Sequence, residues 1–161
     1  MMRVIIIGVA GLIMIFAAGM LGLAKREETL NIDSLIKYYA NHWDLEYALV
    51  KAIAKAESNL NPNAKNPSDP SYGLMQITPI LAQDFGLVKD WRNPTPDEIA
   101  SMMNPMTNLD IACWFLNHLS KYSFDRMVQS YNVGETGYSN GARNYTYLEK
   151  VRSYYEIYNT S

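Results

Sequence analysis

An uninterrupted apolar run near the start of the chain constrains its structure more than any other feature. The run extends over 21 residues, at positions 4–24, and contains no charged side chain. At a helical rise of about 1.5 Å per residue it would be about 31 Å long, which matches the roughly 30 Å hydrocarbon core of a bilayer. We therefore predict a transmembrane helix at residues 1–24 as an N-terminal anchor, followed by a linker at residues 25–31.

The charges around this run favour one orientation in the membrane. Arg3 precedes the run, whereas Lys25-Arg26-Glu27-Glu28 after it is neutral overall. Because an excess of positive charge stays on the cytoplasmic side, we expect the rest of the chain on the periplasmic or extracytoplasmic side. A cleaved signal peptide is the alternative, since the small residues at 22–24 resemble a cleavage site, although the apolar cores of signal peptides usually run for only about 7–15 residues.

The pattern of residues 32–161 is typical of a single, mostly α-helical domain. Apolar residues recur at three- and four-residue steps over positions 32–43 and 45–56, as on the buried face of a helix. Asp44 precedes the second of these helices and is expected to cap it. Residues 59–72 contain three prolines and four asparagines, so we expect an irregular but ordered loop there. We find no convincing alternating strand and no internal repeat.

Local start and stop signals predict the later helices. Thr95 can cap a helix, Pro96 suits its first position, and Glu98 can complete a capping box. The glycines and asparagines between positions 134 and 144 predict a loop. The expected elements are a short helix or turn that begins at Gly73, a helix from Pro96 to about Met103, helices at Asn108–Lys121 and Arg126–Asn132, and a last helix that carries Tyr147, Val151, Tyr154 and Tyr158.

Composition excludes several classes of function. The single cysteine, Cys113, lies in an apolar helical stretch and is expected to be a buried thiol. With only two histidines, no paired cysteines and no Gly-rich phosphate loop, the chain gives no support for a metal, nucleotide or other cofactor. The net charge of −2 and the absence of a long basic run argue against nucleic acid as a partner.

Glu57 is the candidate for acid–base chemistry. It follows the apolar stripe at 45–56 and is separated by the irregular loop from Gly73-Leu74-Met75-Gln76-Ile77. A carboxyl group half-buried by the apolar face of its own helix has a raised pKa and can donate a proton near neutral pH. An isolated glutamate is more often a solvated surface residue, so the motifs around Glu57 decide between the two interpretations.

Five short motifs occur in an order that is specific, although each motif alone is weak. They are Ala52-Ile53-x-x-x-Ala56-Glu57-Ser58-x-x-x-Pro62-x-Ala64, Gly73-Leu74-Met75-Gln76-Ile77-x-Pro79, Asn108-Leu109, Ser130-Tyr131-Asn132-x-Gly134 and Tyr147-Leu148-x-x-Val151. In this order the chain resembles the soluble lytic transglycosylase (SLT) family over roughly residues 33–158. The resemblance implies a lysozyme-like fold, mostly α within the α+β class, with a catalytic cleft.

The resemblance also implies a reaction. Family members cleave the β-1,4 bond between N-acetylmuramic acid and N-acetylglucosamine in peptidoglycan and form a 1,6-anhydro ring. By this resemblance Glu57 would first protonate the glycosidic oxygen and would then, as a carboxylate, accept the proton of the muramyl 6-hydroxyl. Most glycosidases need two carboxylates, but attack by the substrate's own hydroxyl removes that need.

Motif positions assign substrate-binding roles by the same resemblance. Met75 is expected to offer a flat apolar group to a sugar face and Gln76 an amide to an N-acetyl group. Tyrosine hydroxyls at 131 and 147 are expected to hydrogen-bond the catalytic carboxyl or the substrate. Core packing is the alternative for the methionine and the tyrosines, and ordering of the loop is the alternative for Ser58. The full set of expected substrate-binding residues is Ser58, Ser71, Met75, Gln76, Tyr131, Asn132 and Tyr147.

One segment departs from the family pattern. Where the family commonly has Ser-x-x-Gly-Ala-x before Gly73, this chain has Pro67-Ser68-Asp69-Pro70-Ser71-Tyr72. We therefore expect a different loop backbone, and leave open whether Ser68 or Ser71 contacts the substrate. Asp69 adds a carboxylate, which keeps a hydrolytic muramidase as an alternative. A catalytically inactive peptidoglycan-binding or assembly subunit is the third interpretation.

Together, the resemblance and the apolar run predict a small, membrane-anchored, single-domain member of the family. Its expected partners are peptidoglycan glycan strands and, through the N-terminal helix, the membrane. Small members of the family also serve phage virions, conjugation and secretion apparatus, so a phage-encoded or mobile-element-encoded protein, including one in a virion membrane, is among the expectations. The sequence does not select among these roles.

Overall fold

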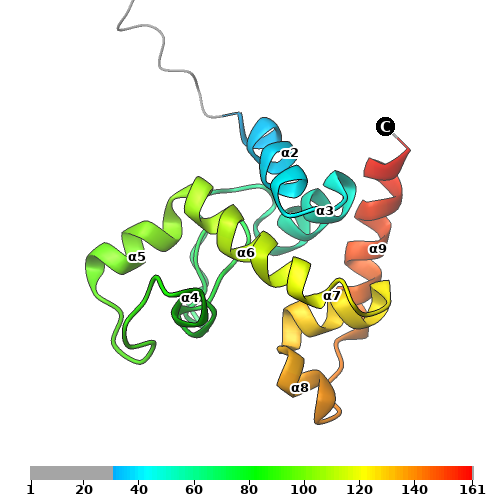
Figure 1. Ribbon diagram of the computed structural model, residues 1–161. Helices are drawn as coiled ribbons and strands as arrows, with labels where there is room; N and C mark the ends of the chain where they lie inside the picture. Colours follow the sequence, from blue (N-terminus) through cyan, green and yellow to red (C-terminus); the bar gives the residue numbers. More distant parts are fainter. Residues whose placement is uncertain (1–30, 161) are drawn as a thin grey trace, which may run out of the picture. The chain divides into compact units, whose positions relative to one another are not determined.

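The computed structural model describes residues 31–160, and these residues are mostly helical (Figure 1). The only β pairing among them consists of isolated bridges that Tyr72 makes with Lys65 and Ile77. The expected α+β element is therefore absent as a regular strand from this part of the chain. The helices are α2 (Ile32–His42), α3 (Tyr47–Ser58), α4 (Pro79–Phe85), α5 (Pro96–Met103), α6 (Pro105–Leu119), α7 (Phe124–Val133), α8 (Glu135–Ser139) and α9 (Tyr145–Asn159).

Two packing relationships organise the domain. Helix α6 packs against α2, α4, α5 and α7, and Figure 1 shows it crossing the middle of the domain. Helix α3 makes its most extensive contact with α9, although a long stretch of sequence separates them. The apolar stripe of α3 is buried against its neighbours α2 and α9, and Ile53 is completely inaccessible to solvent. The helices thus enclose one hydrophobic core.

The capping signals are confirmed at α5. The Thr95 hydroxyl accepts a hydrogen bond from the Glu98 amide, and the Glu98 carboxylate accepts one from the Thr95 amide, which forms a complete capping box. The helix covers Pro96–Met103, as predicted. The next helix begins three residues before the predicted start at Asn108, because Asn104 caps it and Pro105 occupies its first position.

Two local predictions are wrong. Asp44 does not cap α3, because its backbone is left-handed, with φ of 52°, and Glu46 stands at the N-cap position without a side-chain cap bond. The predicted loop between positions 134 and 144 contains the short helix α8. This helix is closed by hydrogen bonds such as the one from the Tyr138 amide to the Gly134 carbonyl, which glycine-rich composition did not reveal.

The loop after α3 is ordered and irregular, as predicted. Asn59 and Leu60 adopt left-handed backbone conformations and end the helix. Two asparagine side chains then accept hydrogen bonds from backbone amides two residues ahead, Asn61 from Asn63 and Asn66 from Ser68. These are the local turns that asparagine favours.

Asn108 joins this loop region to α6. Its completely buried side chain accepts a hydrogen bond from the Met75 amide at 2.7 Å and donates to the carbonyls of Tyr72 and Met102 at 2.7 and 2.8 Å. Gly73 lies against this side chain with φ of +77°, and a Cβ there would come within 2.5 Å of the Asn108 amide nitrogen. Both the backbone conformation and the close approach therefore require glycine.

The remaining expectations about the fold concern Cys113 and the anchor. Cys113 is buried and free, and burial raises the pKa of its thiol to about 12, which agrees with a core residue. Within residues 31–160 no helix has the length and apolar character that crossing a bilayer requires. The predicted anchor at residues 1–24 and the linker before Asn31 lie outside the described residues.

Replacement of Asn108 tests its structural importance. We expect Asn108→Ala to lower the free energy of unfolding by about 3 kcal/mol, because it leaves one buried amide and two buried carbonyls without partners. Urea unfolding followed by circular dichroism measures the change. The control Asn41→Ala alters an exposed asparagine of α2 and should change stability by less than about 0.5 kcal/mol. Equal stabilities for the two variants would contradict this account.

Candidate active site

Glu57 lies in the last turn of α3 and is half-buried against α9. Its Oε1 atom accepts a hydrogen bond of 2.6 Å from the hydroxyl of Tyr147, a residue 90 positions further along the chain. Tyr147 is itself buried, with 8% of its surface exposed. The packing of α3 on α9 therefore creates this pair, which is one of the two hydrogen bonds that the sequence analysis expected for Tyr147.

Burial controls the acidity of Glu57. Loss of hydration raises the pKa of this carboxyl to about 7, while the hydrogen bond from Tyr147 and the positive charge of Lys150 partly oppose the increase. The Lys150 ammonium also donates a 2.6 Å hydrogen bond to the carbonyl of Ala56, at the C-terminal end of α3. A cation at this position is favourable because helix carbonyls point toward it. Glu57 can thus exist in both protonation states near neutral pH.

A pocket of about 550 Å³ opens beside Glu57. Its lining comes from the end of α3, the loop at 59–72, the turn at Gln76, and α9. Glu57 is the only carboxylate among the residues that line it. Within residues 31–160 no group of three or more histidine, cysteine, aspartate or glutamate side chains is placed to hold a metal ion. The lining residues are Lys55, Ala56, Glu57, Ser58, Asn59, Ala64, Lys65, Asn66, Pro67, Gln76, Lys150 and Tyr154.

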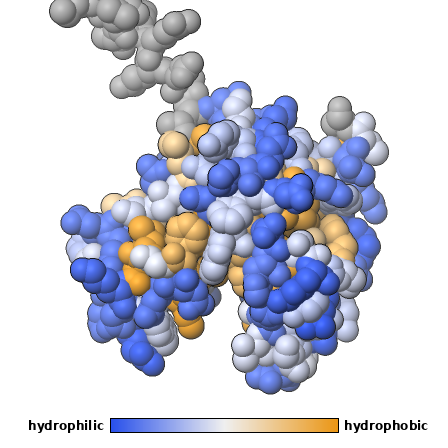
Figure 2. All heavy atoms as spheres, viewed as in Figure 1, coloured by the Kyte–Doolittle hydropathy of each residue, from blue (hydrophilic) through white to orange (hydrophobic). Residues whose placement is uncertain are grey.

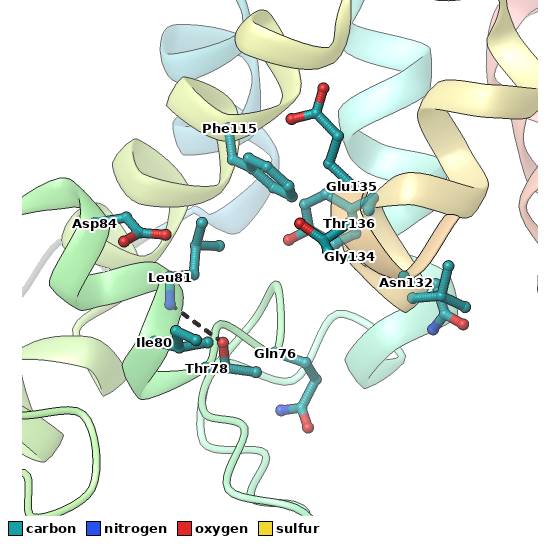
Figure 3. Close-up of a pocket in the computed structure, with 13 residues that line it drawn as sticks. Gln76, Thr78, Ile80, Leu81, Asp84, Phe115, Asn132, Gly134, Glu135 and Thr136 are labelled. Atoms are coloured by element: carbon teal, nitrogen blue, oxygen red, sulfur yellow. Dashed lines mark hydrogen bonds between the residues drawn. The ribbon is translucent and has the colours of Figure 1, made fainter. Parts of the chain in front are cut away.

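A second pocket, of about 510 Å³, adjoins the first at Gln76, which lines both (Figure 3). Side chains from α4, Phe115 of α6 and residues 131–137 form its walls. Figure 2 shows the corresponding notch between the part of the domain built from α4 and α5 and the part built from α7 and α8. We refer to the two pockets together as the groove.

Gln76 is held rigidly between the two pockets. Its backbone is left-handed, with φ of 49°, which is uncommon for a residue other than glycine. The side-chain amide donates to the Gly73 carbonyl at 2.9 Å and to the Ala64 carbonyl at 3.3 Å, and its oxygen accepts from the Ser71 hydroxyl at 2.8 Å. Ser71 is buried, so its hydroxyl orients Gln76. In the altered loop Ser71 thus contacts Gln76, whereas Ser68 is exposed.

Met75 does not have the predicted surface role. Its side chain is completely inaccessible and packs in the core, so it cannot offer a flat face to a sugar in this conformation. The Met75 carbonyl instead accepts a 2.9 Å hydrogen bond from the Tyr131 hydroxyl. Burial and the nearby Glu57 carboxyl hold the pKa of Tyr131 well above 10. Tyr131 thus bonds the turn rather than the carboxyl, and it also lines the second pocket.

Of the other expected site residues, Ser58 has a structural contact and Asn132 lines the second pocket. The Ser58 hydroxyl donates to the Leu74 carbonyl at 2.7 Å, so it ties the end of α3 to the turn at 73–77. This agrees with the ordering role considered for it. Asn132 is exposed in the second pocket, and its oxygen accepts a 2.8 Å hydrogen bond from the side chain of Asn144, the N-cap of α9.

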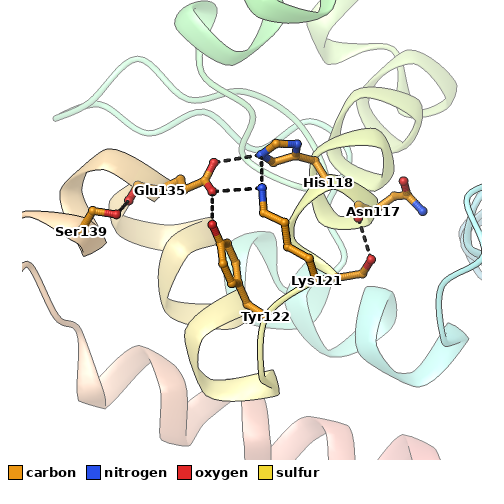
Figure 4. A network of polar contacts seen from close by, with 7 residues as sticks. Asn117, His118, Lys121, Tyr122, Glu135 and Ser139 are labelled. Atoms are coloured by element: carbon orange, nitrogen blue, oxygen red, sulfur yellow. Dashed lines mark hydrogen bonds and ion pairs between the residues drawn. The ribbon is translucent and has the colours of Figure 1, made fainter.

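A polar network fixes α8 at the edge of the second pocket (Figure 4). Glu135 accepts a 2.6 Å hydrogen bond from the Tyr122 hydroxyl, lies 2.9 Å from His118 Nε2, and pairs with Lys121 at 3.3 Å. These contacts, that of Tyr122 first, hold the pKa of Glu135 at about 2. Although Glu135 lines the groove, its carboxylate is engaged in holding α8 against the end of α6.

Asp69 does not lie in the pocket beside Glu57. It is exposed and lines a third depression with Trp91 and Arg92, which shares Thr78 and Ile80 with the second pocket. The carboxylates that line the second pocket are Asp84 and Glu135. Asp69 is therefore not part of the lining beside Glu57, and a hydrolytic reaction through this residue stays an alternative hypothesis.

Three residues that shape the site were not predicted from the sequence. Lys150 follows Tyr147 by three positions, a spacing that puts both side chains on one face of a helix, and this signal could have identified it. Asn108 was noted only within a motif, yet a polar residue at the start of the most apolar helix indicates a buried hydrogen-bonding role. Phe115, which forms a wall of the second pocket, carries no signal beyond helical periodicity.

Comparison with known proteins assigns the chain to a family. The sequence model of the Transglycosylase SLT domain family matches residues 34–152, and the chain belongs to this family. A curated relative, Membrane-bound lytic murein transglycosylase E from Buchnera aphidicola subsp. Acyrthosiphon pisum (strain APS), is 33% identical over 91 residues, which are 56% of this chain and 40% of that protein.

A solved structure shows the same fold. Lytic Transglycosylase Slt from Pseudomonas aeruginosa, in the form of an inactive glutamate-to-glutamine mutant, matches with a TM-score of 0.60 at 19% identity. The match covers 79% of this chain and 24% of that one. The mostly helical, lysozyme-like fold is therefore established for this domain. The chain spans less than half the length of either relative.

The raised pKa of Glu57 predicts a pH-dependent stability. Because the folded-state pKa is about 7 rather than 4.5, folding favours the neutral carboxyl, and stability falls as pH rises from about 4.5 to 7. Ionised Glu57 therefore costs the folded state on the order of 3 kcal/mol at pH 8. We expect Glu57→Gln to raise the free energy of urea unfolding at pH 8 by up to this amount, and to have little effect at pH 4.

The control for this comparison is Glu156→Gln, which changes an exposed carboxyl on α9. It should alter stability by less than about 0.5 kcal/mol at both pH values. A Glu57→Gln variant that is no more stable than the wild type at pH 8 would show that burial does not penalise the carboxylate.

The hydrogen bond from Tyr147 gives a second prediction. Because this bond favours the ionised form of Glu57, Tyr147→Phe should raise the pKa of Glu57 above about 7. A carbon-13 NMR titration of the Glu57 carboxyl measures the shift. Tyr145→Phe, at an exposed tyrosine of the same helix, serves as the control and should leave the titration unchanged. A fall in the pKa of Glu57 in Tyr147→Phe would contradict the assignment.

Proposed function

We propose that this protein is a peptidoglycan lytic transglycosylase that cleaves the β-1,4 bond between N-acetylmuramic acid and N-acetylglucosamine and forms a 1,6-anhydromuramyl product. Membership of the transglycosylase SLT domain family supports the proposal, as do the names of the relatives. The observation that carries it is Glu57, a carboxyl with a pKa of about 7 and the only carboxylate among the described residues that line its pocket.

The protonated form of Glu57 would begin the reaction. Tyr147 occupies Oε1, so Oε2 is the oxygen available to carry the proton and to donate it to the glycosidic oxygen. Protonation allows the bond between that oxygen and the anomeric carbon of the muramyl residue to break. The N-acetylglucosamine side leaves with a neutral hydroxyl, and Glu57 becomes a carboxylate that the Tyr147 hydroxyl and the Lys150 charge stabilise.

The same carboxylate would complete the reaction. It accepts the proton of the muramyl 6-hydroxyl while the oxygen of that hydroxyl forms a bond to the anomeric carbon, which closes the 1,6-anhydro ring. Glu57 returns to its protonated form, and no water is consumed. Intramolecular attack suits a pocket with a single carboxylate, because water activation would need a second one at about 6.5–9.5 Å.

The remaining site residues have proposed roles along the groove. Gln76, fixed between the two pockets, would present its exposed edge to the substrate, and Asn132 and Tyr131 would contact a sugar in the second pocket. Ser58, Ser71 and Met75 act by holding the turn that carries Gln76. Phe115, in the wall of the second pocket, offers a ring on which a sugar face can stack.

We also propose that the protein acts at the membrane surface on the periplasmic or extracytoplasmic side. The apolar run at 4–24 supports this location, and one relative is named as membrane-bound. Anchoring would maintain a high local concentration of the domain next to the wall. A cellular role in wall turnover and a role in a phage virion, conjugation or secretion apparatus are both compatible with such an anchored enzyme.

The products of digestion test this function. Purified sacculi treated with the protein should release muropeptides with 1,6-anhydromuramyl ends, lighter by one water than hydrolysed ones in mass spectrometry. Glu57→Gln should lower the rate at least about 100-fold, since it removes the acid and the base together. Asp69→Asn, outside the pocket, should retain a rate near that of the wild type. Hydrated products would instead indicate a muramidase, and an inactive wild type would indicate a binding subunit.

A further inference from the structure

Three lysines from three separate elements line the pocket beside Glu57. Lys55 belongs to α3, Lys65 to the loop at 59–72, and Lys150 to α9. None of them takes part in the ion pairs formed within the described part of the chain. The one acidic residue in the lining, Glu57, has a pKa of about 7 and is therefore only partly ionised near neutral pH. The pocket thus carries uncompensated positive charge.

This local charge opposes the charge of the molecule as a whole. The chain has a net charge of −2, so its overall field does not attract an anionic polymer. A concave site lined by one sign of charge nevertheless focuses the potential and selects ligands of the opposite sign. An anionic group is therefore the occupant that this pocket favours.

The two halves of the groove differ in chemistry. The second pocket has apolar walls that include Phe115 and Leu81, which suit the faces of sugar rings. The pocket beside Glu57 has the lysines together with Asn59 and Asn66. Its volume of about 550 Å³ is enough for several residues of an extended peptide. In peptidoglycan, peptides that carry free carboxylates hang from the muramyl residues, next to the bond to be cleaved.

We propose, on the basis of the proposed function, that Lys55 and Lys65 bind the carboxylates of peptidoglycan stem peptides beside the cleavage site. The enzyme would thereby prefer glycan strands whose peptides retain negative charge. Lys65 lies two residues before the segment that departs from the family pattern, and Pro67 of that segment lines the same pocket. Lys150 has a different task, because its ammonium donates to the Ala56 carbonyl and its charge acts on Glu57.

The experiment compares two forms of one substrate. Soluble, uncrosslinked glycan strands with intact stem peptides are divided, and in one half the peptide carboxylates are converted to neutral amides. The sugars and the peptide length stay the same, so the ratio of kcat/KM between the two forms measures recognition of charge. We expect the wild type to prefer the charged form by about three- to tenfold, as for two exposed charge contacts, and to lose the preference at high salt.

Variants then assign the preference to the pocket. Lys55→Gln/Lys65→Gln should reduce the preference to near unity, and Lys55→Arg/Lys65→Arg should retain it. The matched control, Lys89→Gln, removes an exposed lysine outside the pocket and should preserve the wild-type ratio. Lys150 is left unchanged in these variants, since its loss would also alter the acidity of Glu57.

The outcomes separate this inference from the proposed function. If the wild type cleaves neither form, the proposed function fails, and the inference that rests on it fails with it. If both forms yield 1,6-anhydro products with equal kcat/KM, the function stands and the peptide-binding role of the lysines is overturned. A preference that persists in Lys55→Gln/Lys65→Gln would also overturn it, because the charge would then be recognised elsewhere.

Discussion

The three buried hydrogen bonds of the Asn108 side chain are the interaction on which the site depends. They fix the turn at 73–77 against α6, and this turn carries the groups that surround Glu57. The Leu74 carbonyl accepts a hydrogen bond from the Ser58 hydroxyl, and the Met75 carbonyl accepts one from the Tyr131 hydroxyl. A single amide with both donor and acceptor groups thus positions the groove, because each backbone group that it binds would be costly to bury alone.

The electrostatics of Glu57 reflect a balance between burial and two groups supplied by α9. Burial favours the neutral acid, whereas the Tyr147 hydroxyl and the Lys150 ammonium favour the carboxylate. Burial alone would raise the pKa so far that the acid would not ionise near neutral pH. Strong interaction with Tyr147 and Lys150 alone would leave a carboxylate that carries no proton to donate. The resulting pKa of about 7 permits both proton donation and proton acceptance at one residue. The extensive contact between α3 and α9 therefore sets the acidity of Glu57 in addition to building the core.

Much of the helical fold could be predicted because its signals are local. The capping box at Thr95 and Glu98 defined the start of α5, and the apolar stripe at 45–56 defined the face that α3 buries. Helix α8 could not be predicted, since five residues that include a glycine form a helix only when contacts such as those of Glu135 support it. For Met75 the sequence left a core position and a place in the cleft as alternatives, because methionine suits both, and the structure places it in the core.

The sequence by itself determined the family and the positions of most helices, and it singled out Glu57 as the candidate acid, because short motifs and periodic patterns are properties of neighbouring residues. Only the tertiary structure decided the partners of Glu57, the role of Ser71 and the exclusion of Asp69 from the pocket. It also brought Lys55, Lys65 and Lys150 into one pocket. The physical reason is distance along the chain: burial and electrostatic effects depend on which groups folding brings together.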